Sequence, residues 1–347
     1  MIDFFTHKVL FASTFDVSFG DAITNAYWAK YFFYKFKLRA QIHCYINEKT
    51  YEKVGWFLHN YHPCDRVFIH PCTSTIFIKE KFENLGRDYY DIVIIDHVYG
   101  DLLGQLKLFF TKAEFLTGNP TIHNKLGIPL ISKKYESTNF IEEYSNGFLP
   151  FDLWKQYDEF DKILTGRKFV AVFPCSTRVL SSLNYEGVQK VIDFAKSKNM
   201  VTVLCGESFD SYTTNSTFQK SIREVLERCT DESVINLMGL GIYKICKWIE
   251  KAEYIFYGPT GSSMLGIYDM SINPNSYLLN AGDSSIMRDI YNQKPKYMPL
   301  QKMNVLTTSC PFFPCGRFSE EQASEKVKRC RDNKRASCLN EELIINI

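Results

Sequence analysis

The chain has 347 residues, of which 45% are hydrophobic and 15% aromatic, and this is enough apolar material for two cores of ordinary size. Its 41 Lys and Arg residues nearly balance its 39 Asp and Glu residues, so no overall field attracts nucleic acid or an anionic membrane, although a local basic patch is compatible with this balance. No apolar run approaches the length of a membrane span, and the N-terminus lacks the regions of a secretory signal. We therefore expect a cytoplasmic protein.

In the first half of the chain, short apolar runs alternate with longer helical patterns, which is typical of βαβ units and parallel sheets. The run IVIID ends in Asp96 and His97, as expected of a central parallel strand that leads into a polar loop. Residues 117–130 (TGNPTIHNKLGIPL) contain glycines and prolines that break the pattern. An aromatic-rich helix is predicted over 21–36, and strands are predicted at 8–13, 40–46, 65–70 and 90–97.

The second half repeats this alternation after a polar, aromatic connector, and we place the domain boundary between residues 161 and 162. In the segment NYEGVQKVIDFAKSKN, Val188, Val191, Ile192 and Ala195 fall on one helical face, which predicts an amphipathic helix. The sequence therefore predicts an α/β protein with two doubly wound, Rossmann-like domains, 1–161 and 162–309, and a cysteine-containing tail, 310–347. The predicted strands of the second domain are 169–174, 201–206, 233–239 and 252–258.

The segment IFYGPTGSS joins the last of these strands to a second apolar run with helical character. Ligands of open α/β sheets bind beyond the carboxyl ends of the strands. At that position Thr260, Gly261 and Ser262 would present backbone N–H groups and hydroxyls at a helix N-terminus, which is a favourable site for phosphate. A tight strand-to-helix turn made by Pro259 and Gly261 explains the same residues without a ligand.

The motifs of the second half, FVAVFPCSTR, VTVLCGES and VINLMGLGIYKICKWIEKAEYIFYGPTGSS, resemble the donor domain of glycosyltransferase family 9, the ADP-heptose:lipopolysaccharide heptosyltransferases. In the first half, VLFASTFDVSFGDAITNAYWAKYFF is similar to the first strand of the family and its Gly-Asp motif, here Gly20 and Asp21, and YDIVIIDH resembles a later strand. The tail CPFFPC…ASCLNEELI is similar to the cysteine-bearing end of the family. The resemblance covers most of the chain and implies a GT-B fold, in which two Rossmann-like domains face each other across a cleft.

Two departures from the family pattern concern the donor. The family has a lysine and a Trp-Pro pair after the first donor turn, where this chain has Ser181 near the expected lysine and Leu183-Asn184 in place of the pair. Arg178 can supply the missing charge, because a guanidinium holds phosphate with two hydrogen bonds. The last turn of the family reads Asp-(Thr/Ser)-Gly with a histidine three residues after the glycine, where this chain has Pro259-Thr260-Gly261 and Met264. The sugar and the nucleotide of the donor are therefore left open.

Sugar transfer needs a base that takes the proton of the acceptor hydroxyl, and groups that hold the departing diphosphate. The resemblance implies that Asp21 is this base, and Asp16 in the same loop is the alternative. Asp21 can also be interpreted as an aspartate that only stabilises the N-terminus of a helix. Gly20 and His97 are assigned to the acceptor side. No Asp-x-Asp metal motif occurs, so no metal is expected to be required for catalysis. The predicted donor-binding residues are Ser176, Thr177, Arg178, Glu207, Thr260, Gly261 and Ser262.

Four of the eleven cysteines, Cys310, Cys315, Cys330 and Cys338, lie close together in the tail, whereas the others are scattered. The spacing of the first two is compatible with tetrahedral zinc, but the second close pair of a typical zinc motif is missing. A structural zinc or iron held by four thiolates and metal-free structural thiols are therefore the two interpretations of the tail.

We predict a glycosyltransferase that moves a hexose, heptose or pentose from a nucleotide-diphosphate donor to a hydroxyl of a glycan, either lipopolysaccharide or a surface polysaccharide, in the cytoplasm or peripherally at the inner membrane. One alternative is a phage-type enzyme that glycosylates a hydroxymethylated base in DNA, which the basic segment KVKRCRDNKRASC permits. The other is a non-catalytic family member that binds nucleotide or glycan, because the lysine, aspartate and histidine of the family are missing.

Overall fold

The structure is a computed structural model of the whole chain, which divides into two compact units, residues 1–146 and 147–347. The predicted boundary near residue 162 lies outside the described residues and stays a prediction. None of the described helices is both long enough and apolar enough to span a membrane. The structure describes residues 8–12, 42–47, 67–72, 86, 88–95, 100–117, 120–130, 164–175, 182–206, 223–239, 248–249, 251–258, 273–279, 304–306, 308–310, 330 and 337–347.

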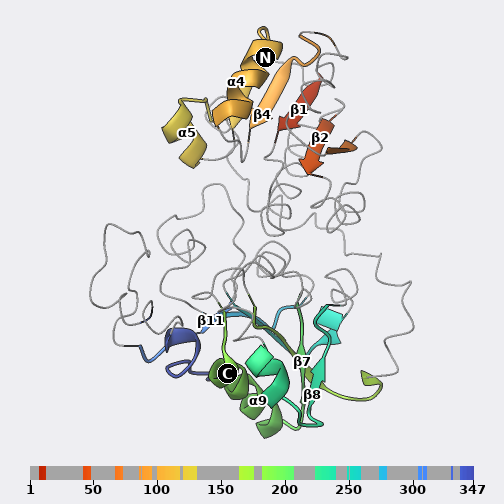
Figure 1. The fold of residues 1–347 in the computed structure, drawn as a ribbon, viewed down its shortest axis with the longest axis vertical. Coiled ribbons are helices and arrows are strands. Elements are labelled where there is room, and N and C mark those ends of the chain that lie inside the picture. Colours follow the sequence, from red (N-terminus) through yellow and green to blue (C-terminus); the bar gives the residue numbers. More distant parts are fainter. Residues whose placement is uncertain are drawn as a thin grey trace. The chain divides into compact units, whose positions relative to one another are not determined.

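The first unit contains a five-stranded sheet with the order β3-β2-β1-β4-β5, and all of its strand pairs are parallel (Figure 1). Because β1 lies between β2 and β4, the winding of the chain reverses at β1, as in other doubly wound sheets. The four predicted strands are confirmed, and a fifth is added at one edge. The strands are β1 (Val9–Ala12), β2 (Ile42–Asn47), β3 (Val67–Cys72), β4 (Ile92–Ile95) and β5 (Glu114–Thr117).

Two helices of the first unit, α4 (Gly100–Phe109) and α5 (Pro120–Leu126), lie on either side of β5 in the chain. The core of the unit forms where the buried side chains of β4 meet Leu106 of α4 and Phe110 behind it. Helix α5 lies within the segment that glycines and prolines were expected to break. Its Pro120 is the first helical residue, where proline is tolerated because the N–H that it lacks has no partner within the helix.

The second unit contains a six-stranded sheet with the order β11-β10-β9-β6-β7-β8, again with only parallel pairs. Its winding reverses between β6 and β9. The four predicted strands are confirmed as β6 to β9, and β10 and β11 extend the sheet. The strands are β6 (Phe169–Phe173), β7 (Val201–Leu204), β8 (Val234–Asn236), β9 (Tyr254–Tyr257), β10 (Ser276–Leu279) and β11 (Asn304–Leu306).

Helix α9 (Tyr185–Ser197) packs against β6 and β7, and it is the amphipathic helix that the sequence predicted. Asn184 is its N-cap, and the four residues of the predicted apolar face are all buried. The short 3-10 helix η5 (Ser337–Leu339) belongs to a C-terminal segment that packs into the same core through Leu339 and Leu343. The second unit therefore has a core that includes the last residues of the chain.

Candidate functional site

The carboxyl ends of β6 and β9 lie next to each other in the second unit. Phe173 is paired with Tyr257, and the N–H of Gly258 donates a hydrogen bond to the carbonyl of Phe173 at 3.2 Å. The segments that begin at Pro174 and Gly258 therefore leave the sheet side by side, at the point where ligands of doubly wound sheets bind. These are the segments that carry the two predicted donor turns.

The residues of those turns lie outside the described part of the chain, so the structure fixes where each turn starts but not the contacts of its side chains. The same holds for Glu207, which follows β7. The predicted residues concerned are Ser176, Thr177, Arg178, Glu207, Thr260, Gly261 and Ser262.

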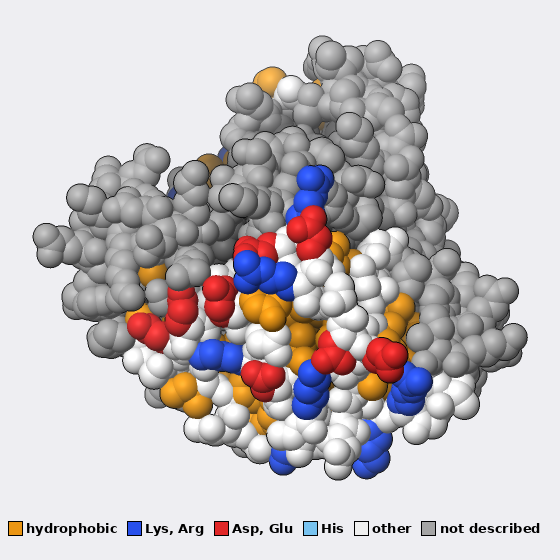
Figure 2. All heavy atoms as spheres, turned by 60° about the horizontal axis from the view of Figure 1, so that its bottom comes forward, with side chains coloured by type: hydrophobic (Ala, Val, Ile, Leu, Met, Phe, Trp, Pro, Cys, Tyr) orange, Lys and Arg blue, Asp and Glu red, His pale blue; other side chains and the backbone are white. Residues whose placement is uncertain are grey.

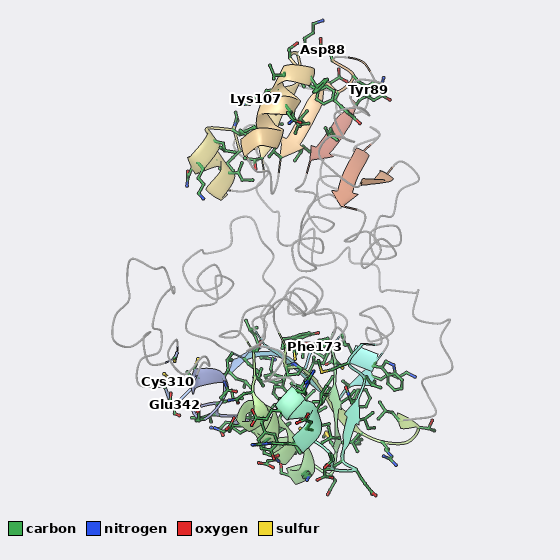
Figure 3. The ribbon with its side chains drawn as sticks, viewed as in Figure 1. Asp88, Tyr89, Lys107, Phe173, Cys310 and Glu342 are labelled. Atoms are coloured by element: carbon green, nitrogen blue, oxygen red, sulfur yellow. The ribbon has the colours of Figure 1, made fainter. Side chains whose placement is uncertain are left out.

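A pair of stacked aromatic rings supports this edge of the sheet. The rings of Phe173 and Tyr257 lie 5.0 Å apart between centroids with an angle of 15° between their planes, and both side chains are buried. Such pairs contribute roughly 0.5–1.5 kcal/mol beyond the burial of their area. Figure 3 shows Phe173 at this end of the sheet. The strand ends from which the two turns start are therefore joined by packed side chains as well as by the backbone hydrogen bond.

The loop between β6 and α9, which contains the first predicted turn, is closed at its base. The N–H of Leu183 donates to the carbonyl of Pro174 at 2.8 Å, so the start of α9 lies beside the carboxyl end of β6. Asn184 then caps the helix, and its side chain accepts a hydrogen bond from the N–H of Gly187 at 3.3 Å. Asn184 was not among the predicted site residues, although an asparagine just before an amphipathic pattern is a known N-cap signal.

Two buried cysteines follow the strands at this edge, and their burial disfavours the reactive thiolate form. Cys175 is the second residue after the end of β6, and Cys205 comes directly after β7. Burial raises the pKa of both thiols far above the ordinary value. Because only a thiolate is an effective nucleophile or metal ligand, we assign both residues to packing.

In the first unit, the corresponding edge is formed by β1 and β4. These strands are parallel neighbours, and Ala12 is paired with Ile95. The segment after β1 carries Gly20, Asp21 and the alternative Asp16, and the segment after β4 carries His97. All four lie outside the described residues, but the segments that contain them begin at adjacent strand ends, where a doubly wound sheet places its ligand.

Three of the four tail cysteines are described. Cys338 is buried in the core of the second unit, Cys310 packs against the same core, and Cys330 is partly exposed, whereas Cys315 lies outside the described residues. Figure 3 shows Cys310 close to Glu342 at this end of the unit. No three His, Cys, Asp or Glu side chains come together as metal ligands within the described ranges. The metal-bound tail therefore stays a prediction.

No protein-family model and no curated protein matches the sequence. Among solved structures, the ADP-heptose lipopolysaccharide heptosyltransferase II of E. coli is similar, with 13% identity and a TM-score of 0.56 over 94% of this chain and 98% of that one. A glycosyltransferase of family 9 from Veillonella parvula DSM 2008 matches with 14% identity and a TM-score of 0.59, covering 98% and 94% of the two chains. The chain has a GT-B fold.

A third similar structure supports the GT-B fold over nearly the full length of both chains. The E. coli heptosyltransferase WaaC with ADP is 11% identical, and the match covers 94% of this chain and 99% of that one with a TM-score of 0.51. The α/β class and the two Rossmann-like units predicted from the sequence are thereby confirmed. At these identities the similarity concerns the fold, and the function has to be argued from the site.

Proposed function

We propose that the protein is a glycosyltransferase that moves a sugar from a nucleotide-diphosphate donor to a hydroxyl of a glycan. The observation that carries this proposal is the pairing of β6 with β9, which starts two turns rich in hydroxyl and glycine residues at one sheet edge of a GT-B fold. Backbone N–H groups and hydroxyls of both turns would hold the diphosphate, and Arg178 would supply positive charge.

The proposed reaction gives each unit its own task. Asp21, in the loop after β1, accepts the proton of the acceptor hydroxyl as its oxygen forms a bond to the anomeric carbon of the sugar. The bond from that carbon to the diphosphate breaks at the same time, and the diphosphate leaves with the electron pair. Its growing negative charge is stabilised by Arg178 and by the backbone N–H groups near Gly261. No metal ion is needed in this scheme.

We propose a glycan acceptor, such as lipopolysaccharide or a surface polysaccharide, in preference to DNA. Figure 2 shows Lys and Arg side chains interspersed with Asp and Glu side chains over the described part of one face. Binding of DNA depends on clustered cations that neutralise phosphates, and this part of the face shows no such cluster. We propose that the enzyme works in the cytoplasm or peripherally at the inner membrane, where such glycans are assembled.

Binding of nucleotides tests the donor site directly. We expect ADP, UDP or GDP to raise the melting temperature of the protein by mass action. Arg178→Ala should weaken this binding, and Gly261→Val should weaken it too, because a branched side chain would crowd the backbone N–H groups away from the phosphates. Isothermal titration calorimetry measures both effects, and variants that bind as tightly as the wild type would show that the phosphate site is misplaced.

Loss of transfer with retained donor binding tests the base. Asp21→Asn keeps the shape of the side chain but removes its basicity, so we expect transfer to fall by about 10²–10⁴-fold. Donor binding should change little, because Asp21 belongs to the other unit. Asp16→Asn is the matched control in a transfer assay with labelled nucleotide sugars. If Asp16→Asn loses activity and Asp21→Asn keeps it, the base is Asp16; if neither variant changes the rate, the assignment from the family is wrong.

A further inference from the structure

The C-terminal segment 337–347 packs along helix α9. Lys190 of α9 donates hydrogen bonds to the carbonyls of Glu341 and Leu343, the second at 2.8 Å. On its other side, the segment pairs with the residues behind β11 through a bridge between Thr308 and Leu343. Figure 1 shows the C-terminus beside α9. The C-terminal segment is therefore held between α9 and the residues that follow β11.

The first turn of α9 contains only half of a capping box. In a complete box, the N-cap side chain accepts from the N–H of the third helical residue, whose own side chain returns an acceptor to the N–H of the N-cap. Asn184 makes the first of these bonds. The third helical residue is Gly187, which has no side chain to make the second.

Asn340 supplies the missing half from the other end of the unit. Its side-chain oxygen accepts a hydrogen bond from the N–H of Asn184 at 2.7 Å, across 156 residues of chain. The side chain of Asn340 is fully buried, and Asn184 is only 8% exposed. Because a buried N–H without an acceptor is costly, this bond fixes the position at which α9 begins.

Gly187 is needed for this contact because any side chain would occupy the place of the tail. A Cβ at Gly187 would lie 2.3 Å from the carbonyl oxygen of Leu339 and 2.7 Å from the side-chain oxygen of Asn340. The first of these atoms belongs to the backbone and cannot move aside cheaply. The glycine that leaves the capping box incomplete is thus also the residue that admits Asn340.

We propose that Asn340 is a positioning residue for the donor site, an inference that rests on the proposed function. The N–H groups of two successive residues, Leu183 and Asn184, are held by the carbonyl of Pro174 and by the side chain of Asn340. The first bond closes the β6–α9 loop, and the second ties the end of that loop to the tail. Asn340 therefore fixes the C-terminal end of the segment that carries Arg178, the residue to which the proposed function assigns the diphosphate of the donor.

Hydrogen exchange of the whole protein tests the positioning without any ligand. In Asn340→Ala, the buried N–H of Asn184 loses its acceptor. The backbone amides of peptides that cover 182–190 should therefore exchange at least about tenfold faster than in the wild type. Asn340→Asp keeps an oxygen at this position and should exchange more slowly than Asn340→Ala. Thr308→Val is the control, because the hydroxyl of Thr308 donates to the backbone carbonyl of Glu342 at 3.0 Å, on the other side of the tail. In this variant, exchange at 182–190 should match that of the wild type.

Binding of ADP and UDP tests the link to the donor. We expect the Kd of the diphosphate that the wild type prefers to rise by roughly tenfold in Asn340→Ala, since small displacements of a positioned group have large effects. Asn340→Asp should recover most of the affinity, and Thr308→Val should retain it. Lys190→Met provides a milder second variant, with a smaller loss, if Asn340→Ala does not fold.

The two measurements separate the inference from the function on which it rests. Unchanged exchange at 182–190 in Asn340→Ala, or in Lys190→Met where the first variant does not fold, overturns the positioning role. Faster exchange with an unchanged Kd overturns the link to the donor. A wild type that binds neither ADP nor UDP counts against the proposed function, and exchange alone then decides whether Asn340 holds the loop.

Discussion

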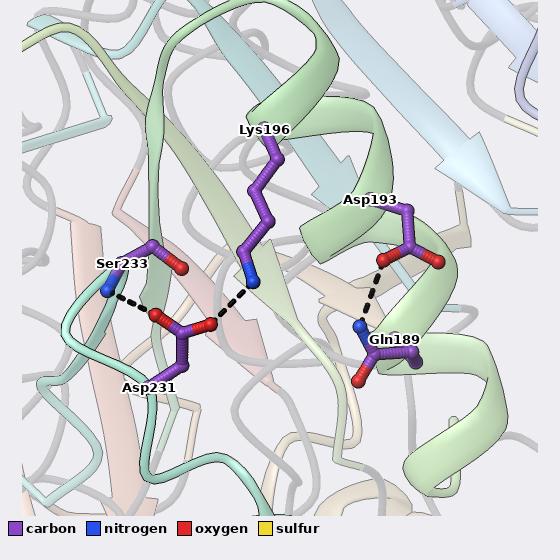
Figure 4. A network of polar contacts seen from close by, with 5 residues as sticks. All are labelled: Gln189, Asp193, Lys196, Asp231 and Ser233. Atoms are coloured by element: carbon purple, nitrogen blue, oxygen red, sulfur yellow. Dashed lines mark hydrogen bonds and ion pairs between the residues drawn. The ribbon is translucent and has the colours of Figure 1, made fainter.

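Asp231 shows how a single carboxylate connects α9 with the turn that precedes β8. The side chain of Lys196, near the end of α9, donates to Asp231, and the N–H of Ser233 donates to the other carboxylate oxygen at 2.9 Å (Figure 4). The hydrogen bond from Lys196 is the main cause, and that from Ser233 the next, of a pKa lowered to about 2 for Asp231. The contact joins the C-terminal end of α9 to the turn before β8.

The lowered pKa of Asp231 predicts that the stability of the fold depends on pH. A carboxylate with a lower pKa in the folded than in the unfolded state stabilises the fold above the unfolded value, and this contribution is lost as the pH falls towards the folded value. We therefore expect the difference in melting temperature between the wild type and Asp231→Asn to be largest near pH 6 and to vanish between about pH 4 and pH 2. Melting curves followed by circular dichroism across this range measure it.

Asp193→Asn is the control, because Asp193 is an exposed carboxylate of α9 that accepts a hydrogen bond from Gln189, which lies four residues away on the same helix (Figure 4). The contact of Asp231 lies at the surface, where salt screens charge. Its contribution should therefore shrink at high ionic strength. A pH-independent difference for Asp231→Asn would show that the carboxylate is not held in its charged form.

The sequence predicts contacts of single residues only where they are local. The N-cap role of Asn184 is readable from an asparagine just before an amphipathic pattern. The acceptor that Asn340 gives to the same residue is not readable, because the two asparagines are 156 residues apart and no periodicity connects them. The donor turns can be predicted only in part. The strands before them are evident from short apolar runs, but the pairing of β6 with β9 depends on the whole sheet.

Among the elements, the strands that the sequence did not predict all lie at or beside the edges of their sheets. β5 forms one edge of the first sheet and is buried only in its second half, and β10 and β11 end the second sheet with four and three residues. Central strands such as β6 are buried at every position and therefore show as continuous apolar runs. The segments of β5, β10 and β11 show neither such a continuous run nor a strict alternation, so their composition does not reveal them.

The cysteine-containing C-terminal tail is the segment in which the sequence predicts a bound metal. If the tail cysteines hold a structural ion, purified protein should contain about one zinc or iron per chain, and the double variant Cys310→Ser, Cys315→Ser should lose it, because both thiolates would be ligands. Elemental analysis by mass spectrometry measures the content. Cys175→Ser is the control, since this thiol is buried in the β6 region and is assigned to packing. Metal-free protein with full activity would favour simple structural thiols.

At the scale of the whole molecule, each unit has a hydrophobic core of its own. Leu106 belongs to the core of the first unit and Ile192 to that of the second, and each is at most 2% exposed. Since domains with separate cores often unfold in separate steps, we expect more than one transition in calorimetry of the full chain. The calorimetric enthalpy should then exceed the value that a single two-state transition would give.

Two core variants and one ligand assign these transitions. Truncating either residue to alanine should cost about 2–5 kcal/mol, because it removes buried methyl groups and leaves a cavity. Leu106→Ala should lower one transition and Ile192→Ala the other. A bound nucleoside diphosphate, at 100 times its Kd, should stabilise only the transition that Ile192→Ala lowers, by about 2.7 kcal/mol, because the proposed donor site lies wholly in the second unit. If the ligand instead raises the temperature of the transition that responds to Leu106→Ala, the donor has been assigned to the wrong unit. If a single transition responds equally to both variants, the two units unfold together.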